Sequence, residues 1–216
     1  MLHVIVDLAR QAITERGAYR IVLTGGRTPR RLYELLRSAD ADWKAWHVYF
    51  GDERCLPQDD AERNSLMAEQ AWLNHVPIPP AQIHPIPAEL DAEAAAQKYT
   101  RTLESIGQFD TVLLGLGEDG HVASLFPDHD PGDAPDAPDV MAVHHAPKPP
   151  PDRVSLSARR LSATRRLLFL VTGMAKQQAI HDWRQGVSIP ASFVAPAKGV
   201  DVYVEAALLQ GSAQPL

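Results

Sequence analysis

Residues 109–121 read FDTVLLGLGEDGH, a short β-favouring run that ends at once in a glycine-rich turn. Phe109–Leu114 is mostly apolar without strict alternation, which is typical of a strand covered by helices on both faces of a parallel sheet. Similar runs occur at Tyr19–Leu23, His47–Phe50 and Leu167–Val171, and a glycine follows each within two residues. This recurrence predicts a parallel sheet with loops at the carboxyl ends of its strands.

Helical patterns alternate with these strands and with a fifth run at Val200–Val204. The predicted helices are His3–Arg16, a helix through Leu32–Leu36 that follows Pro29, Ala61–Asn74, Glu89–Ser105 and Met174–Arg184. The alternation predicts an α/β fold: a modified doubly wound (Rossmann-like), mostly parallel sheet flanked by helices, forming a single domain over residues 1–216. Pro127–Pro151 is dense in proline and aspartate, so we expect no regular structure there. It is either a flexible excursion or a loop beside a site.

Composition narrows the class of protein. The 216 residues are 45% hydrophobic and 22% charged, a balance that excludes wholesale disorder. No apolar stretch of about 18 residues occurs, so we expect no membrane partner. The net charge of −6 argues against nucleic acid as the main partner. Cys55 is the only cysteine, and Met1–Arg10 has the pattern of an amphipathic helix, not a secretory signal, so we expect a cytoplasmic protein.

The first candidate site is LTGGRTP at residues 23–29, between a predicted strand and a predicted helix. Gly25 and Gly26 allow a sharp turn and a close approach of backbone to ligand. Free N–H groups at the helix start favour an anion such as phosphate, and Arg27 and Thr28 add donors. The structural alternative is a tight turn with Thr28 as the N-cap. No Gly-Lys-Ser/Thr follows, so this is not a nucleotide-hydrolysing loop.

The segment from Gly115 to His121 is the second candidate and matches Gly-x-Gly-x-x-Gly. A dinucleotide site is disfavoured because two acids occupy the turn and the following helix has room only from about His121 to Phe126. His121 at a strand end instead suits general base chemistry, with Asp119 as the carboxylate that orients it. The alternative is that His121 caps a helix or satisfies a loop carbonyl.

A third candidate follows the strand that ends at Phe50. Asp52 and Arg54 in GDER are predicted to lie at the same sheet edge as the other candidates and to reach a shared cleft. The neighbouring Cys55 is disfavoured as a nucleophile, because no cysteine–histidine pairing is visible.

A fourth candidate, Lys176, stands in the first turn of a predicted helix, where a lysine is favourable only beside an anion. Arg153 is a further possible anion contact. The remaining histidines, at 129 and 144–145 among others, lack compact ligand spacing, so we expect no metal site. No Gly-x-Ser-x-Gly elbow occurs, which weakens a serine hydrolase interpretation.

Together these segments resemble the 6-phosphogluconolactonase family. The resemblance spans residues 20–205 and is carried by LTGGRTP, YFGDERCLP, ERNSLM, LLGLGEDGHVASLFP, APKPPPDRVSLS and VTGMAKQQ, in that order. It implies hydrolysis of 6-phospho-D-glucono-1,5-lactone to 6-phosphogluconate in the pentose phosphate pathway, on a modified doubly wound α/β fold. It also implies that no cofactor or metal takes part. We expect the substrate to be the sugar-phosphate lactone and the protein to be a monomer or a weak homodimer.

By similarity, His121 is the general base that activates water and Asp119 orients it. The resemblance assigns Asp52 and Arg54 to the sugar hydroxyls and to organising the site, with Arg54 also steadying the developing negative charge. It assigns the phosphate to the turn from Gly25 to Thr28 and to Lys176, with Arg153 as a weaker contact.

Three positions depart from the family pattern. Arg27 replaces a usual serine, and Glu205 replaces a near-terminal aspartate. The family also carries a strand before the first helix, so either the sheet here has one strand fewer or the start is truncated.

Two alternatives differ in class from a lactonase. A glucosamine-6-phosphate deaminase would share the phosphate turn, Asp52, His121 and Lys176, but the ASLFP segment after the histidine favours the lactonase. A non-catalytic sugar-phosphate sensor would retain the fold and lose the catalytic groups, whereas Asp52, Arg54, Asp119 and His121 are all present here. Such a sensor would normally carry a DNA-binding module, and no basic helix-turn-helix segment occurs.

Overall fold

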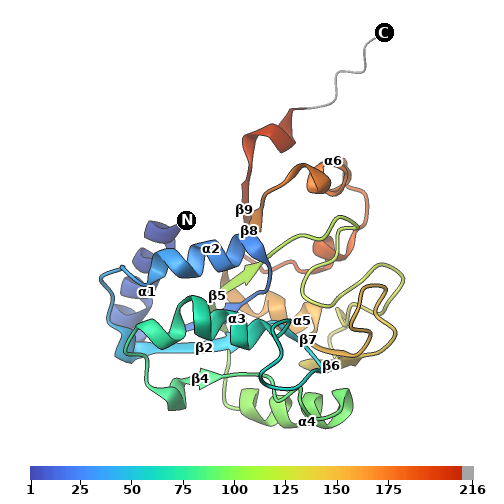
Figure 1. The fold of residues 1–216 in the computed structure, drawn as a ribbon. Helices are drawn as coiled ribbons and strands as arrows, with labels where there is room; N and C mark the ends of the chain where they lie inside the picture. Colours follow the sequence, from blue (N-terminus) through green and yellow to red (C-terminus); the bar gives the residue numbers. More distant parts are fainter. Residues whose placement is uncertain (211–216) are drawn as a thin grey trace.

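The computed structural model describes residues 1–210, and its centre is a six-stranded sheet in which all neighbouring strands are parallel (Figure 1). In spatial order the strands are β4 (Ile83–His84), β2 (Trp46–Phe50), β1 (Tyr19–Leu23), β5 (Phe109–Leu114), β8 (Thr164–Val171) and β9 (Val200–Val204). All five strands predicted from the sequence are present, and the short β4 is an addition. The predicted parallel sheet is confirmed.

Helices cover this sheet. They are α1 (Leu2–Arg16), α2 (Arg27–Leu36), α3 (Asn64–Ala71), α4 (Ala92–Leu103), α5 (Ala158–Ser162) and α6 (Gln177–Arg184). Short 3-10 turns lie at η1 (Trp43–Ala45), η2 (Leu73–His75), η3 (Pro80–Gln82), η4 (Met174–Lys176), η5 (Pro190–Phe193) and η6 (Ala206–Leu209). α1 packs on β1 and β5, and α2 contacts β8. The doubly wound fold class is therefore confirmed, while the single domain over residues 1–216 stays a prediction whose last six residues lie outside the described part.

Several helix boundaries differ from the predicted ones. The helix after β1 begins at Arg27 with Gly26 as its N-cap, so Thr28 is inside the helix and caps nothing. No helix forms from His121 to Phe126, because Ala123 has a positive φ and the segment closes as a bridge between Val122 and Leu125. These changes leave residues 115–126 as an irregular loop at the end of β5.

A second sheet, which is antiparallel, was not predicted from the sequence. Its three strands are ordered β3 (Asp52–Arg54), β7 (Arg153–Leu156) and β6 (Val140–Val143). The expectation of no regular structure in Pro127–Pro151 is thus wrong for Val140–Val143, which gains its order from pairing with β7. In Figure 1 the connections of residues 115–152 gather on one side of the molecule around this sheet.

Gly51 joins the two sheets. Its N–H donates to the carbonyl of Leu23 at the end of β1 (2.9 Å), and its carbonyl accepts from the N–H of Leu156 in β7 (2.8 Å). The buried Tyr99 of α4 adds to the junction, since its hydroxyl accepts from the N–H of Phe50 at 2.9 Å. The chain therefore leaves the parallel sheet at Phe50 and enters the small sheet at Asp52 along a fixed course.

A buried carboxylate positions the helix beside this junction. Glu53 is fully buried (0% exposed), and its two carboxylate oxygens accept from the N–H groups of Asn64 and Ser65, both at 2.8 Å. An acid at this place caps the N-terminus of α3 and complements the helix dipole. Arg63, itself 2% exposed, pairs with Glu53 at 3.2 Å and donates to the carbonyls of Leu56 and Ile86.

We expect Glu53→Gln to destabilise the protein by about 3 kcal/mol, because it removes the fully buried carboxylate that neutralises the Arg63 guanidinium and leaves only the partly exposed Glu89, 3.5 Å away. Urea unfolding followed by circular dichroism measures this. Glu15→Gln, which removes an exposed carboxylate paired with Arg16, is the control and should leave the midpoint unchanged. Equal midpoints for the Glu53 variant and the wild-type protein would show that the buried pair has no structural role.

Candidate active site

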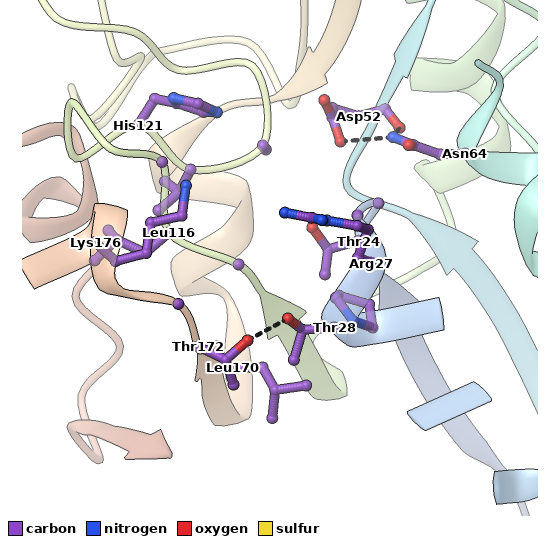
Figure 2. A pocket seen from close by; sticks show the side chains of 18 of the residues that line it. Thr24, Arg27, Thr28, Asp52, Asn64, Leu116, His121, Leu170, Thr172 and Lys176 are labelled. Atoms are coloured by element: carbon purple, nitrogen blue, oxygen red, sulfur yellow. Dashed lines mark hydrogen bonds between the residues drawn. The ribbon is translucent and has the colours of Figure 1, made fainter. Parts of the chain in front are cut away.

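A cavity of about 690 Å³ opens at the carboxyl ends of β1, β5 and β8. Parallel strands place the loops that follow them at one edge, which is where open α/β sheets bind ligands. The sequence-predicted residues that line this cavity are Gly25, Gly26, Arg27, Thr28, Asp52, Arg54, His121, Arg153 and Lys176. Figure 2 shows His121 and Asp52 toward one end of it and Thr28 toward the other.

The turn after β1 forms one wall. Gly25 lies so close to Asn64 that a Cβ on Gly25 would stand 2.0 Å from the amide oxygen of Asn64, so only glycine fits. The Thr28 hydroxyl hydrogen-bonds to the Thr172 hydroxyl at 2.6 Å, which ties the start of α2 to the loop after β8. The Arg27 side chain extends into the cavity (Figure 2). Because the N-terminus of α2 faces the same space, this wall is suited to an anion.

Asp52 is a buried carboxylate (5% exposed) with two side-chain partners. Its Oδ2 accepts from the Ser124 hydroxyl at 2.7 Å, and its Oδ1 accepts from the Asn64 amide at 3.1 Å. These bonds fix the carboxylate in one orientation at the cavity wall (Figure 2). Neither Asn64 nor Ser124 was a candidate in the sequence analysis, although both fall within the motifs ERNSLM and ASLFP that carry the resemblance.

His121 and Asp119 form a dyad in the loop after β5. The imidazole Nδ1 lies 2.5 Å from Asp119 Oδ1, and the His121 backbone N–H donates to the same oxygen at 3.3 Å. A hydrogen on Nδ1 leaves Nε2 as the unprotonated, basic nitrogen. His121 lines the cavity and Asp119 does not, so the carboxylate supports the imidazole from behind.

The glycines of this loop make room for the dyad. A Cβ on Gly117 would lie 1.9 Å from His121 Nδ1, and the Gly117 N–H donates to the His121 carbonyl at 2.7 Å. Close packing of the imidazole therefore explains the second glycine of Gly-x-Gly-x-x-Gly, whereas the third, Gly120, has a φ of 80° and packs against Ile189. No helix follows β5 directly, so the loop lacks the helix N-terminus that a dinucleotide site requires.

Two opposing effects set the proton affinity of His121. Burial lowers its pKa because the charged imidazolium loses solvation, whereas the hydrogen bond and charge of Asp119 raise it. The net pKa lies below the ordinary value, so the imidazole is unprotonated at neutral pH. The pKa of Asp119 is also lowered, by its bonds to His121 and by the charges of His121 and Lys148, against the effect of burial.

The cationic candidates differ in how many partners their side chains already bind. Lys176 at the end of η4 has Glu118 as a distant partner, 3.8 Å away. The carboxylate of Glu205 accepts from the Gly173 N–H at 2.9 Å, so this departure from the family pattern fixes the turn before η4. Arg153 uses Nε and one Nη to hold backbone carbonyls, which leaves its other Nη as the nitrogen outside these bonds. A phosphate contact by Arg153 stays a prediction.

Two other chemistries lack support in the described residues. Burial, with the nearby Asp152, raises the pKa of the Cys55 thiol to about 11, so the thiolate is scarce at neutral pH and a nucleophilic role is disfavoured. Within residues 1–210 there is no group of three or more histidine, cysteine or acidic side chains placed to bind a metal ion.

None of the helices described in residues 1–210 is long and apolar enough to cross a bilayer.

An open parallel sheet with a cation-lined pocket across its carboxyl edge defines an α/β protein built to hold a small anionic molecule. The family model described as glucosamine-6-phosphate isomerases/6-phosphogluconolactonase matches residues 1–203, and the chain belongs to this family. The resemblance found in the sequence motifs is thereby confirmed.

Individual relatives agree with the family match. The 6-phosphogluconolactonase of Streptomyces coelicolor is 38% identical over 87% of this chain and 77% of the relative. A rice protein (Oryza sativa subsp. indica) named probable 6-phosphogluconolactonase 3, chloroplastic, is 36% identical over 81% of this chain, which spans 58% of that longer relative. The crystal structure of 6-phosphogluconolactonase from Thermotoga maritima matches with a TM-score of 0.88 at 31% identity, covering 94% of this chain and 92% of that one.

We expect Asp119→Asn to lower the pKa of His121, because the substitution removes the negative charge that raises it and leaves the burial that lowers it. NMR titration of the imidazole measures this directly, without any assay of activity. The exposed loop residue Asp136 provides a matched control, and Asp136→Asn should leave the titration of His121 in place. An unchanged or raised pKa in the Asp119 variant would contradict the dyad.

Proposed function

We propose that this protein hydrolyses 6-phospho-D-glucono-1,5-lactone to 6-phospho-D-gluconate, with His121 as the general base. The observation that carries the proposal is the His121–Asp119 dyad, which presents an unprotonated imidazole to a cavity that Arg27, Arg54 and Lys176 also line. The family membership and the names of the relatives point to the same reaction.

The proposed reaction needs only water and the side chains of the cavity. The Nε2 atom of His121 accepts a proton from water as the water oxygen attacks the lactone carbonyl carbon. The tetrahedral oxyanion collapses by breaking the bond to the ring oxygen, and the imidazolium returns its proton to that oxygen. Atoms and charges balance, and the carboxylic acid formed then releases one proton. Arg54 would stabilise the oxyanion, and Asp52 would accept hydrogen bonds from the sugar hydroxyls.

The phosphate would bind at the wall formed by the turn after β1, within reach of Lys176. Gly25, Gly26 and the N-terminus of α2 supply backbone donors, while Arg27, Thr28 and Lys176 supply side-chain donors. Binding energy gained at this remote group would orient the lactone carbonyl toward His121. Arg27, which stands where the family usually has serine, adds a guanidinium to this wall.

Location and assembly follow as parts of the proposal. We expect a cytoplasmic enzyme that acts as a monomer or a weak homodimer on a sugar-phosphate lactone. Size-exclusion chromatography with light scattering tests the assembly state.

The deciding experiment measures proton release from freshly prepared 6-phosphogluconolactone, corrected for spontaneous ring opening. We expect His121→Gln to reduce turnover about 100-fold or more, because proton transfer by a positioned base contributes at least that much. Calorimetry should show that the variant still binds 6-phosphogluconate. The exposed His3 supplies the control, His3→Gln, which should be fully active.

Other outcomes identify other functions. Ammonia release from glucosamine 6-phosphate without lactone hydrolysis would assign the protein to the deaminases. Binding of sugar phosphates without either activity would identify a sensor. Full lactonase activity in the His121 variant would leave the reaction intact and refute the role of the base.

We expect Lys176→Met to raise the KM for the lactone about tenfold with a smaller effect on kcat, because a charge-assisted bond to the phosphate is lost. Steady-state kinetics at constant ionic strength measure both constants. Lys198→Met is the matched control, since Lys198 lines a different cavity. A KM equal to that of the wild-type protein would remove Lys176 from the phosphate site.

A further inference from the structure

The proline-rich segment before β7 forms a small closed loop. The Ala146 N–H donates to the Pro151 carbonyl at 2.9 Å, which closes the loop and leaves Lys148 between the two ends. His144, just outside the loop, bonds through Nδ1 to Asp152 at 2.8 Å. Hydrogen bonds on both sides therefore restrict the course of residues 146–151.

Arg153 anchors this loop from within. Its side chain is 5% exposed, its Nε donates to the Pro150 carbonyl (3.0 Å), and its Nη2 donates to the carbonyls of Lys148 (3.2 Å) and Pro149 (3.0 Å). The guanidinium also lies over the ring of Phe126, 5.5 Å from the centroid. A buried guanidinium that satisfies three consecutive carbonyls holds the loop more firmly than surface contacts would.

The anchored loop carries Lys148 to the catalytic dyad. Lys148 Nζ lies 3.5 Å from Asp119 Oδ2, while Asp119 Oδ1 bonds to His121. The two carboxylate oxygens of Asp119 are thus divided between the lysine and the imidazole. Lys148 is absent from the cavity lining, so it meets the dyad from outside the substrate space.

Three charged groups act on His121. The carboxylates of Asp119 and Asp52 favour the imidazolium, and the Lys148 ammonium disfavours it. The ring of Phe126, 4.9 Å from the imidazole, packs on it and carries no charge. Lys148 is therefore the cation that offsets the acids around the base.

We propose that Lys148, held by the Arg153-anchored loop, is a positioning residue of the hydrolytic reaction: it fixes the Asp119 carboxylate behind His121 and keeps the imidazole in its unprotonated, basic form. The inference rests on the proposed lactonase function and deepens it. It assigns the loop before β7 a role in setting the pH range of the reaction.

The test compares Lys148→Met with Lys148→Arg over the acid limb of the pH–rate profile. In the methionine variant the limb moves to higher pH, because the cation that opposes protonation of His121 is gone. We expect kcat/KM at about pH 6 to fall roughly twofold to fivefold and to converge with the wild-type value at about pH 8. The KM for the lactone stays unchanged, and the arginine variant restores the wild-type profile.

NMR titration of His121 in the same proteins gives a readout that does not depend on turnover. The imidazole of the methionine variant should titrate at higher pH than in the wild-type protein, a shift opposite in sign to that expected for Asp119→Asn. Lys98→Met, on the exposed face of α4, is the control and should change neither profile.

The outcomes separate this inference from the proposed function. An unmoved His121 titration in the Lys148→Met protein overturns the inference whatever the activity. A raised KM with an unmoved acid limb also overturns it, because Lys148 would then contact the substrate. Absence of lactonase activity in the wild-type protein refutes the proposed function, and the titration still tests the contact between Lys148 and the dyad.

Discussion

The buried carboxylate of Glu53 is the constraint on which the catalytic end of this molecule depends. Glu53 follows Asp52 directly in β3, and its side chain caps α3 through the N–H groups of Asn64 and Ser65. Because a buried anion needs a counter-ion, Arg63 is fixed beside it, and Arg63 in turn holds the carbonyls of Leu56 and Ile86. The cap sets the position of Asn64, whose amide orients Asp52. An ion pair outside the cavity therefore determines the direction of a carboxylate inside it.

Parallel pairing supplies the second constraint, since it brings the loops after β1, β5 and β8 to one edge of the sheet. The antiparallel sheet then adds groups that parallel pairing alone could not deliver. β7 lies between β3 and β6, so Arg54 pairs with Arg153 in register, and the loop before β7 returns beside the end of β5. The dyad of His121 and Asp119 is reached from one side by this loop and from the other by the cavity.

Strands with a local apolar pattern could be predicted from the sequence. Strands and side-chain contacts that depend on residues far apart in the chain could not. The five apolar strands were predictable because burial on both faces leaves a continuous apolar signature. Strand β3, with the sequence DER, and strand β7, with RVSL, carry no such signature and become strands by antiparallel pairing, β3 with β7 and β7 also with β6. Asp52 was predicted from its place at a strand end, whereas its partners Asn64 and Ser124 are separated from it by 12 and 72 residues. Arg153 was predicted as an anion contact from its charge beside a site, and that contact stays a prediction. The three backbone carbonyls that its side chain binds could not be predicted, because they depend on the folded course of residues 148–150.

Positive charge has two roles near the site: it attracts an anionic substrate, and it disfavours protonation of the imidazole. The chain carries a net charge of −6, yet the cationic side chains that line the cavity are Arg27, Arg31, Arg54, Arg153 and Lys176. A cleft lined by positive charge in a low-dielectric wall concentrates an anion such as a phosphate ester. Positive charge near an imidazole also disfavours its protonation, and Lys148, which lies outside the cavity, is the cation that acts on His121 in this way. Asp119 has the opposite effect, because its carboxylate favours the imidazolium. Both effects are needed, since the imidazole must be basic enough to take a proton from water and yet be unprotonated in the resting enzyme. Lys148 contacts Oδ2 of Asp119, the oxygen that does not bond to His121. It therefore offsets the charge of Asp119 without occupying the cavity.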